Sequence, residues 1–410
     1  MELLFERVAG LDVHRDTVMA CVRHPKPTGK SRQAQTREFS TTTAGLDVMK
    51  RWLQSLDVTH VAMEATGVYW VPVFTVLEND FELLVVNAAH MRNVPGRKTD
   101  VADAGWIAQL LEHGLLRGSF VPPRVFRQLR NLCRYRRTIV AERVRVIQRI
   151  EKALQGAGIK LSSVASTVLS VSGRMMLEAL VAGERDPQRL SQMAKGRLRP
   201  KVPELAEALN GRFDDHHAVL IGQALVHIDQ LDASALVVSA KIASLLEPFE
   251  WALSLLETIP GVSRRIAEII VSEIGVDMTV FATAGHLSSW AGLCPGNNTS
   301  AGHVGPATCR PGSPWLRQAL VEAAWAASRT KNSYLAVRHA RLRARRGKHR
   351  AVIATGHTIL VAVWHMLSKR ERFNELGHEY YSKRNNPTTE AARLLKRLAS
   401  LGMTVTIQPA

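Results

Sequence analysis

Cysteine is scarce in this sequence. The 410 residues contain four cysteines (Cys21, Cys133, Cys294 and Cys309), and no two of them have C-x-x-C spacing. Such scattered positions favour free thiols and indicate neither a disulfide framework nor a cysteine zinc site.

Long uncharged apolar segments are also expected to be lacking. The first ten residues, MELLFERVAG, include Glu2 and Glu6, and on our interpretation charged residues interrupt every later apolar run before it reaches 18 residues. We therefore expect no secretory leader, no membrane-spanning helix and a cytoplasmic protein.

Acidic residues are too few to balance the basic ones. The chain has 36 Asp and Glu against 54 Lys and Arg, which gives a formal net charge of +18 and an isoelectric point near 10.3. This excess favours a polyanionic partner. With 46% hydrophobic and 22% charged residues, the composition is that of a folded protein of two or three domains.

Two segments, 120–160 and 329–350, each carry a net charge of +9 and so account for the whole excess. Arginine dominates both, which suits forked contacts to phosphates. For a single basic run, the alternative to phosphate binding is a solvated helix face. The presence of two such runs in one chain argues against that alternative. Neither run has an apolar face rich in Trp or Phe, so nucleic acid is favoured over an anionic membrane. The basic residues that we expect to contact nucleic acid are Arg124, Arg127, Arg130, Arg134 and Arg137 in the first run and Arg343, Arg345 and Arg346 in the second.

Short β-rich runs and amphipathic stretches alternate over the first 115 residues. The expected order is three strands, helix, strand, helix, strand, helix, at 7–13, 16–22, 35–40, 43–56, 60–67, 69–77, 81–88 and 99–113. This order predicts a mixed α/β layer fold.

Helical periodicity replaces the strand pattern after residue 120. Apolar residues recur every seven positions from Phe126 to Leu154, and a cleaner seam with steps of three and four runs from Ile221 to Leu245. The two helices are expected either to pair as an antiparallel arm or to dimerise with another subunit. Between them, ERDPQRL and KGRLRPKVPE look like loops.

The carboxyl part predicts a compact helical segment over 256–345, interrupted by a long Gly/Pro/Asn-rich loop at 292–314. A loop of this length in a folded domain is usually functional or disordered. An apolar helix at 351–366 and a helix after Pro387 follow.

Four carboxylates occur where an α/β fold can bring them together: Asp12 on the first strand, Glu64 on the fourth, and Asp100 and Asp103 one helical turn apart. Asp12 and Glu64 lie inside apolar runs, where an unpaired carboxylate is costly. Two Mg²⁺ ions would match four converging carboxylates, and this predicts two-metal phosphodiester chemistry. Strand-end acids in ordinary ion pairs are the alternative, and Asp16 is expected at a turn outside the site.

The patterns GLDVH, MEATGVYW and NAAHMRNVPGRKTDVADAGWIAQLL resemble the RuvC-like DEDD domain of bacterial insertion-sequence 110 family transposases, relatives of the Piv-type DNA invertases. The carboxyl patterns LETIPGVSRRIAEIIVSEIG, HLSSWAGLCPGNNTSAGH and GSPWLRQALVEAAWAAS extend the resemblance. It implies that Asp12, Glu64, Asp100 and Asp103 are metal ligands of an RNase H-like domain. The implied organisation is a RuvC-like domain (1–118), a helical coiled-coil arm (119–250), a mostly helical transposase domain (251–345) and a basic helical tail (346–410).

The stretch IPGVSRRIAEIIVSEIG predicts two helices joined by a tight turn at Pro260-Gly261. Exposed amides at the start of the second helix, beside Arg264 and Arg265, suit a phosphate. The segment resembles a helix-hairpin-helix backbone binder, although Ser263 stands where the second glycine is usual. An ordinary helical hairpin is the alternative.

Ser300, in the long loop, matches the position of the family's candidate nucleophile, although from the loop alone it would be one serine among many. The resemblance implies that this serine attacks a DNA phosphate, forms a 5′-phosphoserine link, and meets the carboxylate site of another subunit. Asn298 and His303 are expected to contact nucleic acid; His303 replaces a residue that is often Lys, and a plain surface histidine is the alternative.

The resulting prediction is a Mg²⁺-dependent transposase that cuts and rejoins donor and target DNA. The resemblance implies a non-coding bridge RNA that selects the two sites and a tetramer built as a dimer of dimers. One rival is a RuvC-like junction nuclease or invertase without an RNA guide, in which Ser300 only binds phosphate. The other is a non-catalytic nucleic-acid-binding protein whose carboxylates pair with arginines.

Overall fold

The computed structural model describes residues 3–26, 31–65, 67–87, 103–294, 299–300, 303–304, 309, 311–381 and 387–403. Its internal contacts divide the chain into two compact units, Met1–Val121 and Pro122–Ala410. The finer boundaries at 250 and 345 stay predictions.

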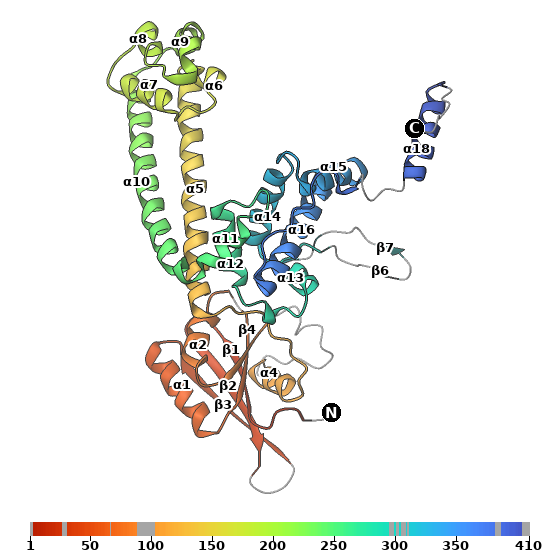
Figure 1. Cartoon of the computed structure of the whole chain (residues 1–410). Coiled ribbons are helices and arrows are strands. Elements are labelled where there is room, and N and C mark those ends of the chain that lie inside the picture. The colour runs from red at the N-terminus through yellow and green to blue at the C-terminus, as the bar shows by residue number, and fades with distance from the viewer. Residues whose placement is uncertain are drawn as a thin grey trace. The chain divides into compact units, whose positions relative to one another are not determined.

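The first unit is built on a mixed five-stranded sheet (Figure 1). Its strands are β1 (Val8–Val13), β2 (Thr17–Pro25), β3 (Arg32–Ser40), β4 (His60–Glu64) and β5 (Glu82–Val86). The order across the sheet is β3-β2-β1-β4-β5. Both β2 contacts are antiparallel, whereas β1 pairs with β4 and β4 with β5 in parallel. The predicted mixed α/β fold is confirmed at this level.

Helices cover both faces of this sheet. Leu11, Val13 and their same-face neighbours pack with α1 (Thr43–Ser55) and α2 (Trp70–Leu77). On the other face, Val8 and Ala62 pack with α4 (Asp103–Glu112). Because side chains alternate along a strand, Asp12 and Glu64 belong to the face that α4 covers.

In the second unit two long helices, α5 (Arg124–Gly156) and α10 (Asp215–Leu246), pack against each other as an arm (Figure 1). Arg136 bonds Ser239, and Arg143, farther along α5, bonds Asp232, which lies earlier on α10. The helices are therefore antiparallel, which was one of the two predicted arrangements.

The seam predicted on α5 is partly wrong. Cys133 and Leu154 are buried as expected, but Val140 is exposed, and Ile139 and Val146 are buried instead. A straight α-helix drifts by about 20° per heptad, so its buried face does not follow a strict seven-residue repeat.

A small globule closes the far end of the arm (Figure 1), and we call residues 157–214 the tip domain. Its helices are α6 (Leu161–Val164), α7 (Val171–Val181), α8 (Pro187–Ser191) and α9 (Val202–Leu209). Leu177, Leu190 and Leu205 form its core together with the adjoining ends of α5 and α10. Both segments between the arm helices that were expected to be loops contain helical turns.

The remainder of the second unit is helical, as predicted. Its helices are α11 (Glu250–Leu256), α12 (Arg264–Ile274), α13 (Ala284–Trp290), α14 (Pro314–Ala327), α15 (Tyr334–Arg346), α16 (Lys348–Lys369) and α18 (Pro387–Ser400). α16 contacts α13, α14 and α15, and α12 contacts α5 and α14.

α16 corrects the expectation about apolar windows. Residues 351–368 contain no Asp, Glu, Lys or Arg, and α16 is long and apolar enough, with a mean hydropathy of 1.5, to cross a membrane by length and composition alone. Half of that window is buried inside the structure. Its contacts with α14 and α15 identify it as a packed core helix of the second unit.

Candidate active site

Asp12 and Glu64 lie next to each other at one end of the sheet. β1 and β4 pair in parallel with Leu11 opposite Met63, and the same register, continued by one residue, aligns Asp12 with Glu64. Both carboxylates are half-buried on the face covered by α4. The strand pairing thus joins two side chains that are 52 positions apart in the sequence.

Asp103 is the first residue of α4, and two contacts fix which end of the sheet it approaches. At the other end of α4, Glu112 pairs with Arg23, the residue opposite Val8 at the start of β1. Ala104 lies against Gly10, where an added Cβ would come within 2.2 Å of the Ala104 carbonyl oxygen. α4 therefore runs antiparallel to β1, and Asp103 lies toward the end that carries Asp12. Asp100 lies outside the described residues.

Glu112 anchors α4, and sequence reasoning missed it. Its side chain is 2% exposed, and its carboxylate pairs with Arg23 at 2.8 Å and Arg32 at 3.0 Å. Burial alone would raise the pKa of Glu112, but the hydrogen bonds and charges of Arg23 and Arg32 outweigh it and lower the pKa below 4.5. No local pattern could have revealed this role, because both arginines lie about 80 or more residues earlier.

His14 is a second residue that sequence reasoning missed. Its Nε2 lies 3.2 Å from Oδ2 of Asp12, and its side chain is 64% exposed. The histidine in GLDVH is two residues beyond Asp12, and same-face spacing along a strand was the available signal.

The three described carboxylates of the site, Asp12, Glu64 and Asp103, offer only oxygen atoms as metal ligands. Oxygen is the ligand atom that Mg²⁺ prefers.

Ser300 lies on a short hairpin formed by β6 (Thr299–Ser300) and β7 (His303–Val304), in which Ser300 pairs with His303. The structure describes the backbone of these residues, and Asn298 lies outside the described residues. The two ends of the long loop are held together. An added Cβ on Gly312 would come within 2.4 Å of the Ala291 backbone, and Arg317 donates to the Gly292 carbonyl.

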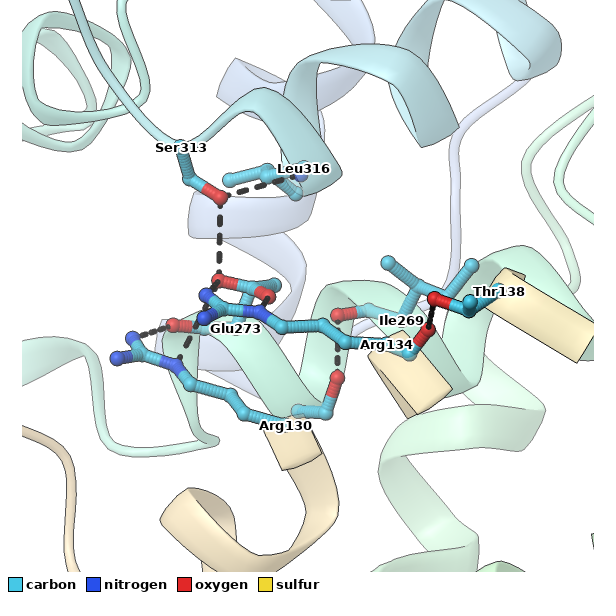
Figure 2. A network of polar contacts seen from close by, with 8 residues as sticks. Arg130, Arg134, Thr138, Ile269, Glu273, Ser313 and Leu316 are labelled. Carbon is cyan, nitrogen blue, oxygen red and sulfur yellow. Dashed lines mark hydrogen bonds and ion pairs between the residues drawn. The ribbon is translucent and has the colours of Figure 1, made fainter. Parts of the chain in front are cut away.

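A polar network centred on the buried carboxylate of Glu273 lies where this loop enters α14 (Figure 2). Arg134 donates to both oxygens of Glu273, at 2.8 and 2.9 Å, and Ser313 donates to one of them at 3.1 Å. Ser313 also caps α14 by accepting from the Leu316 amide. The Glu273 carboxylate therefore connects α5, α12 and the end of the serine loop.

Arg130 belongs to the same network through the Glu273 backbone carbonyl and carboxylate. Burial lowers its pKa to about 10, an effect that Glu273 opposes and that Arg134 adds to. Arg137 pairs with Glu322 at 2.7 Å. These expected nucleic-acid contacts thus have internal partners, and their contact with nucleic acid stays a prediction.

The two helices and the tight turn that the stretch IPGVSRRIAEIIVSEIG (259–275) predicted are observed as α11, a turn at Pro260-Gly261, and α12. Gly261 has a φ of 92° in this turn, and an added Cβ would come within 2.4 Å of the α14 backbone. Arg264 hydrogen-bonds Glu250, which raises the pKa of Arg264, and lies near Glu257 and Glu268. Arg265 is exposed beside the start of α12. Of this pair, Arg265 is the side chain directed to solvent.

The remaining arginines that were expected to contact nucleic acid differ in exposure. Arg124, Arg343, Arg345 and Arg346 are exposed, whereas Arg127 is half-buried and donates to the Pro122 carbonyl. The carboxyl-terminal run therefore offers a basic surface on α15.

One further group of potential metal ligands lies at the start of α10. Ligand atoms of Asp214, His216 and His217 lie within 4.8 Å of one another. Asp214 and His217 form the reciprocal capping box of α10, which accounts for their proximity.

Comparison with known proteins identifies a family for this chain. Residues 9–159 match a model for the DEDD domain of IS110, described as a transposase, and residues 253–340 match a model described as the transposase IS116/IS110/IS902 family. The class that the two matches define is the transposases of insertion sequences.

A curated relative also comes from an IS110 insertion element. The "Insertion element IS110 uncharacterized 43.6 kDa protein" of Streptomyces coelicolor is 30% identical over 254 residues, which cover 57% of this chain and 61% of the relative. The chain belongs to the IS110 family of transposases. The resemblance inferred from the sequence motifs is confirmed.

Proposed function

We propose that this protein is the recombinase of an insertion sequence, which cuts and rejoins donor and target DNA in a Mg²⁺-dependent reaction. The observation that carries the proposal is the alignment of Asp12 with Glu64 at one end of the sheet, under a helix that begins at Asp103. The strand order β3-β2-β1-β4-β5, with three antiparallel strands followed by two parallel ones, supports an RNase H-like, RuvC-like domain.

Asp12, Glu64 and Asp103, with Asp100 as the fourth ligand, would hold the metal. Two Mg²⁺ ions bound there would stabilise negative charge on the attacking and leaving oxygens of a phosphodiester. Half-burial of Asp12 and Glu64 suits this role, because the carboxylates are partly shielded from water yet reachable from solvent.

Ser300 supplies the nucleophile in this proposal. Its hydroxyl oxygen bonds to phosphorus while the bond from phosphorus to the 3′ oxygen breaks. The serine proton is transferred to the released 3′ oxygen, and the 5′ phosphate stays on the serine. Attack by a 3′ hydroxyl of the other DNA reverses these steps and frees Ser300. The pairing of Ser300 with His303 in the β6–β7 hairpin supports a defined backbone conformation at the serine.

The serine and the carboxylates belong to different units of the chain, and we place their meeting between subunits of a dimer of dimers. Large apolar side chains on α10 support contacts between subunits, since Val226, Leu236 and Val237 are each more than half exposed. A bridge RNA that selects the DNA sites, and a cytoplasmic, nucleoid-associated location, complete the proposal. The exposed arginines of α15 support a nucleic-acid partner.

Strand cleavage tests the carboxylate site. Purified protein with its co-purifying RNA is incubated with labelled DNA of the element ends, with Mg²⁺ or EDTA. We expect Asp12→Asn to lower cleavage by about 100-fold or more, because a metal ligand contributes at least as much as its supporting groups. Asp16→Asn is the matched control, since Asp16 lies at the adjacent turn with a 74% exposed side chain. Equal cleavage by Asp12→Asn and Asp16→Asn contradicts the proposal.

A further inference from the structure

The tip domain carries a basic loop that the two charge runs did not include. Residues 195–201, KGRLRPK, contain Lys195, Arg197, Arg199 and Lys201, and no acidic residue occurs from 187 to 203. Gly196–Lys201 forms a 3₁₀ helix that leads directly into α9. All four basic side chains are exposed.

Several arginines of the arm and tip are used in internal ion pairs. Arg143 pairs with Asp232, Arg174 with Asp229 and Glu178, and Arg189 with Glu184 and Asp186. Among the described residues, by contrast, no carboxylate lies within ion-pair distance of Lys195, Arg197 or Arg199. Their charges are therefore available to an external anion.

The loop is held in place although its side chains face solvent. The Lys195 amide donates to the hydroxyl of Ser172 at 2.8 Å, and Ser172 is only 3% exposed. The ammonium of Lys201 lies 3.5 Å from the Val164 carbonyl. An anion that binds here meets charges on a largely ordered backbone, which lowers the entropic cost of binding.

A pocket of about 690 Å³ lies beside the loop. Lys195, Arg197 and Lys201 line it together with Ser166, Ser170 and the first residues of α7. No carboxylate and no aromatic ring is among its lining residues. Cations and hydroxyls suit a phosphate, and without an aromatic ring the pocket has no platform on which to stack a base.

We propose that loop 195–201 and this pocket form a docking site for the phosphate backbone of a nucleic acid, independent of its sequence. The inference rests on the proposed function only for its choice of nucleic acid as the polyanion. The tip domain would thus hold RNA or DNA at a distance along the arm from the serine loop, within the second unit.

Binding in EDTA tests the proposal without any catalytic step. Full-length protein is titrated into a fluorescein-labelled RNA hairpin and, separately, a DNA duplex of arbitrary sequence, at several salt concentrations. Removing a single phosphate-binding charge lowers the slope of log K against log salt by about 0.9 on duplex DNA. We expect the triple variant Lys195→Gln/Arg197→Gln/Arg199→Gln to reduce that slope by about two to three, and Arg197→Gln by about one.

Arg189→Gln is the matched control, because Arg189 is an exposed tip arginine with two acidic partners. Its slope is expected to stay at the wild-type value. A reduction confined to the RNA or to the DNA probe identifies which of them docks. The proposal is overturned if the triple variant and Arg197→Gln both give the same salt slope as the wild-type protein on both probes, while their thermal midpoints are unchanged. Absence of DNA cleavage by the wild-type protein would overturn the proposed function and leave this result standing.

Discussion

Glu273 is a nearly fully buried carboxylate that holds together three parts of the second unit. Arg134 and Ser313 bond its side chain, and Arg130 bonds its backbone and lies close to its carboxylate (Figure 2). Removing the Glu273 carboxylate leaves Arg130, whose side chain is 15% exposed, and Arg134, whose side chain is 36% exposed, without their buried counter-charge. The network therefore couples the stability of this region to the position at which the serine loop ends.

We expect Glu273→Gln to lower the free energy of unfolding of the second unit by about 3 kcal/mol, because two arginines lose their buried counter-charge. Urea denaturation followed by tryptophan fluorescence measures this change. Glu322→Gln is the control, since Glu322 pairs with Arg137 but its side chain is 52% exposed, and we expect a decrease of about 0.5 kcal/mol or less. Equal decreases in the two variants would show that the Glu273 network adds nothing beyond a surface ion pair.

The lowered pKa of Glu112 predicts how the stability of the first unit changes in acid. Its pKa in the folded protein is lowered, so its contribution is complete above the unfolded value near 4.5 and is lost as the pH falls through the lower folded value. Glu112→Gln should therefore destabilise the first unit at neutral pH and weaken the loss of stability below pH 4.5. Thermal unfolding between about pH 3 and 7 measures both effects. An unchanged pH profile in the variant would contradict the assignment.

At this scale the sequence predicted the charged residues of the strands better than those of the helices. Asp12 and Glu64 stand out because carboxylates are costly inside apolar strands. Glu112 and Glu273 look like ordinary helix acids, and their arginine partners are remote in the sequence. Asp100 was predicted from its one-turn spacing to Asp103, and it lies outside the described residues. The role of Ser300 depended on the family resemblance, since nothing local separates it from other loop serines.

At the scale of elements, Gly10 determines how closely α4 approaches β1. A Cβ at residue 10 would lie 2.2 Å from the Ala104 carbonyl oxygen and 2.4 Å from the Ala108 amide nitrogen, both backbone atoms. We expect Gly10→Ala to displace α4, move Asp103 away from Asp12, and weaken both Mg²⁺ binding and thermal stability.

Gly105→Ala on α4 is the matched control. Its added Cβ would meet only the Cys21 sulfur, at 3.7 Å, and alanine favours a helix by up to about 1 kcal/mol over glycine. Isothermal titration with Mg²⁺ and thermal unfolding compare the variants. Gly10→Ala with wild-type Mg²⁺ affinity would contradict the packing argument.

The elements themselves were largely predictable. Periodicity placed the strands and helices of the first unit within a few residues of their observed bounds, because each has a clear apolar face. The tip domain was missed, since Pro and Gly in ERDPQRL and KGRLRPKVPE suggested loops. In fact Asp186 caps α8 and Pro187 occupies its first turn, a combination that begins helices.

At the scale of the whole molecule, the net charge of +18 indicated the kind of partner but not where it binds. Arginines of the run at 120–160 form much of the internal pairing of the second unit, whereas the last arginines of α15 (Arg343, Arg345 and Arg346) and those of loop 195–201 face solvent. A charge run in the sequence does not separate these roles, because the acidic partners come from distant helices.

The most direct test of the central claim is a search for a covalent protein–DNA adduct. Wild-type protein and Ser300→Ala are incubated with the RNA, element-end DNA and Mg²⁺, and the products are separated on a denaturing gel. The proposed serine recombination predicts an adduct through a 5′ phosphate in the wild type and none in Ser300→Ala. Cleavage of equal extent in both proteins, without an adduct, would contradict serine recombination and identify a metal-dependent nuclease.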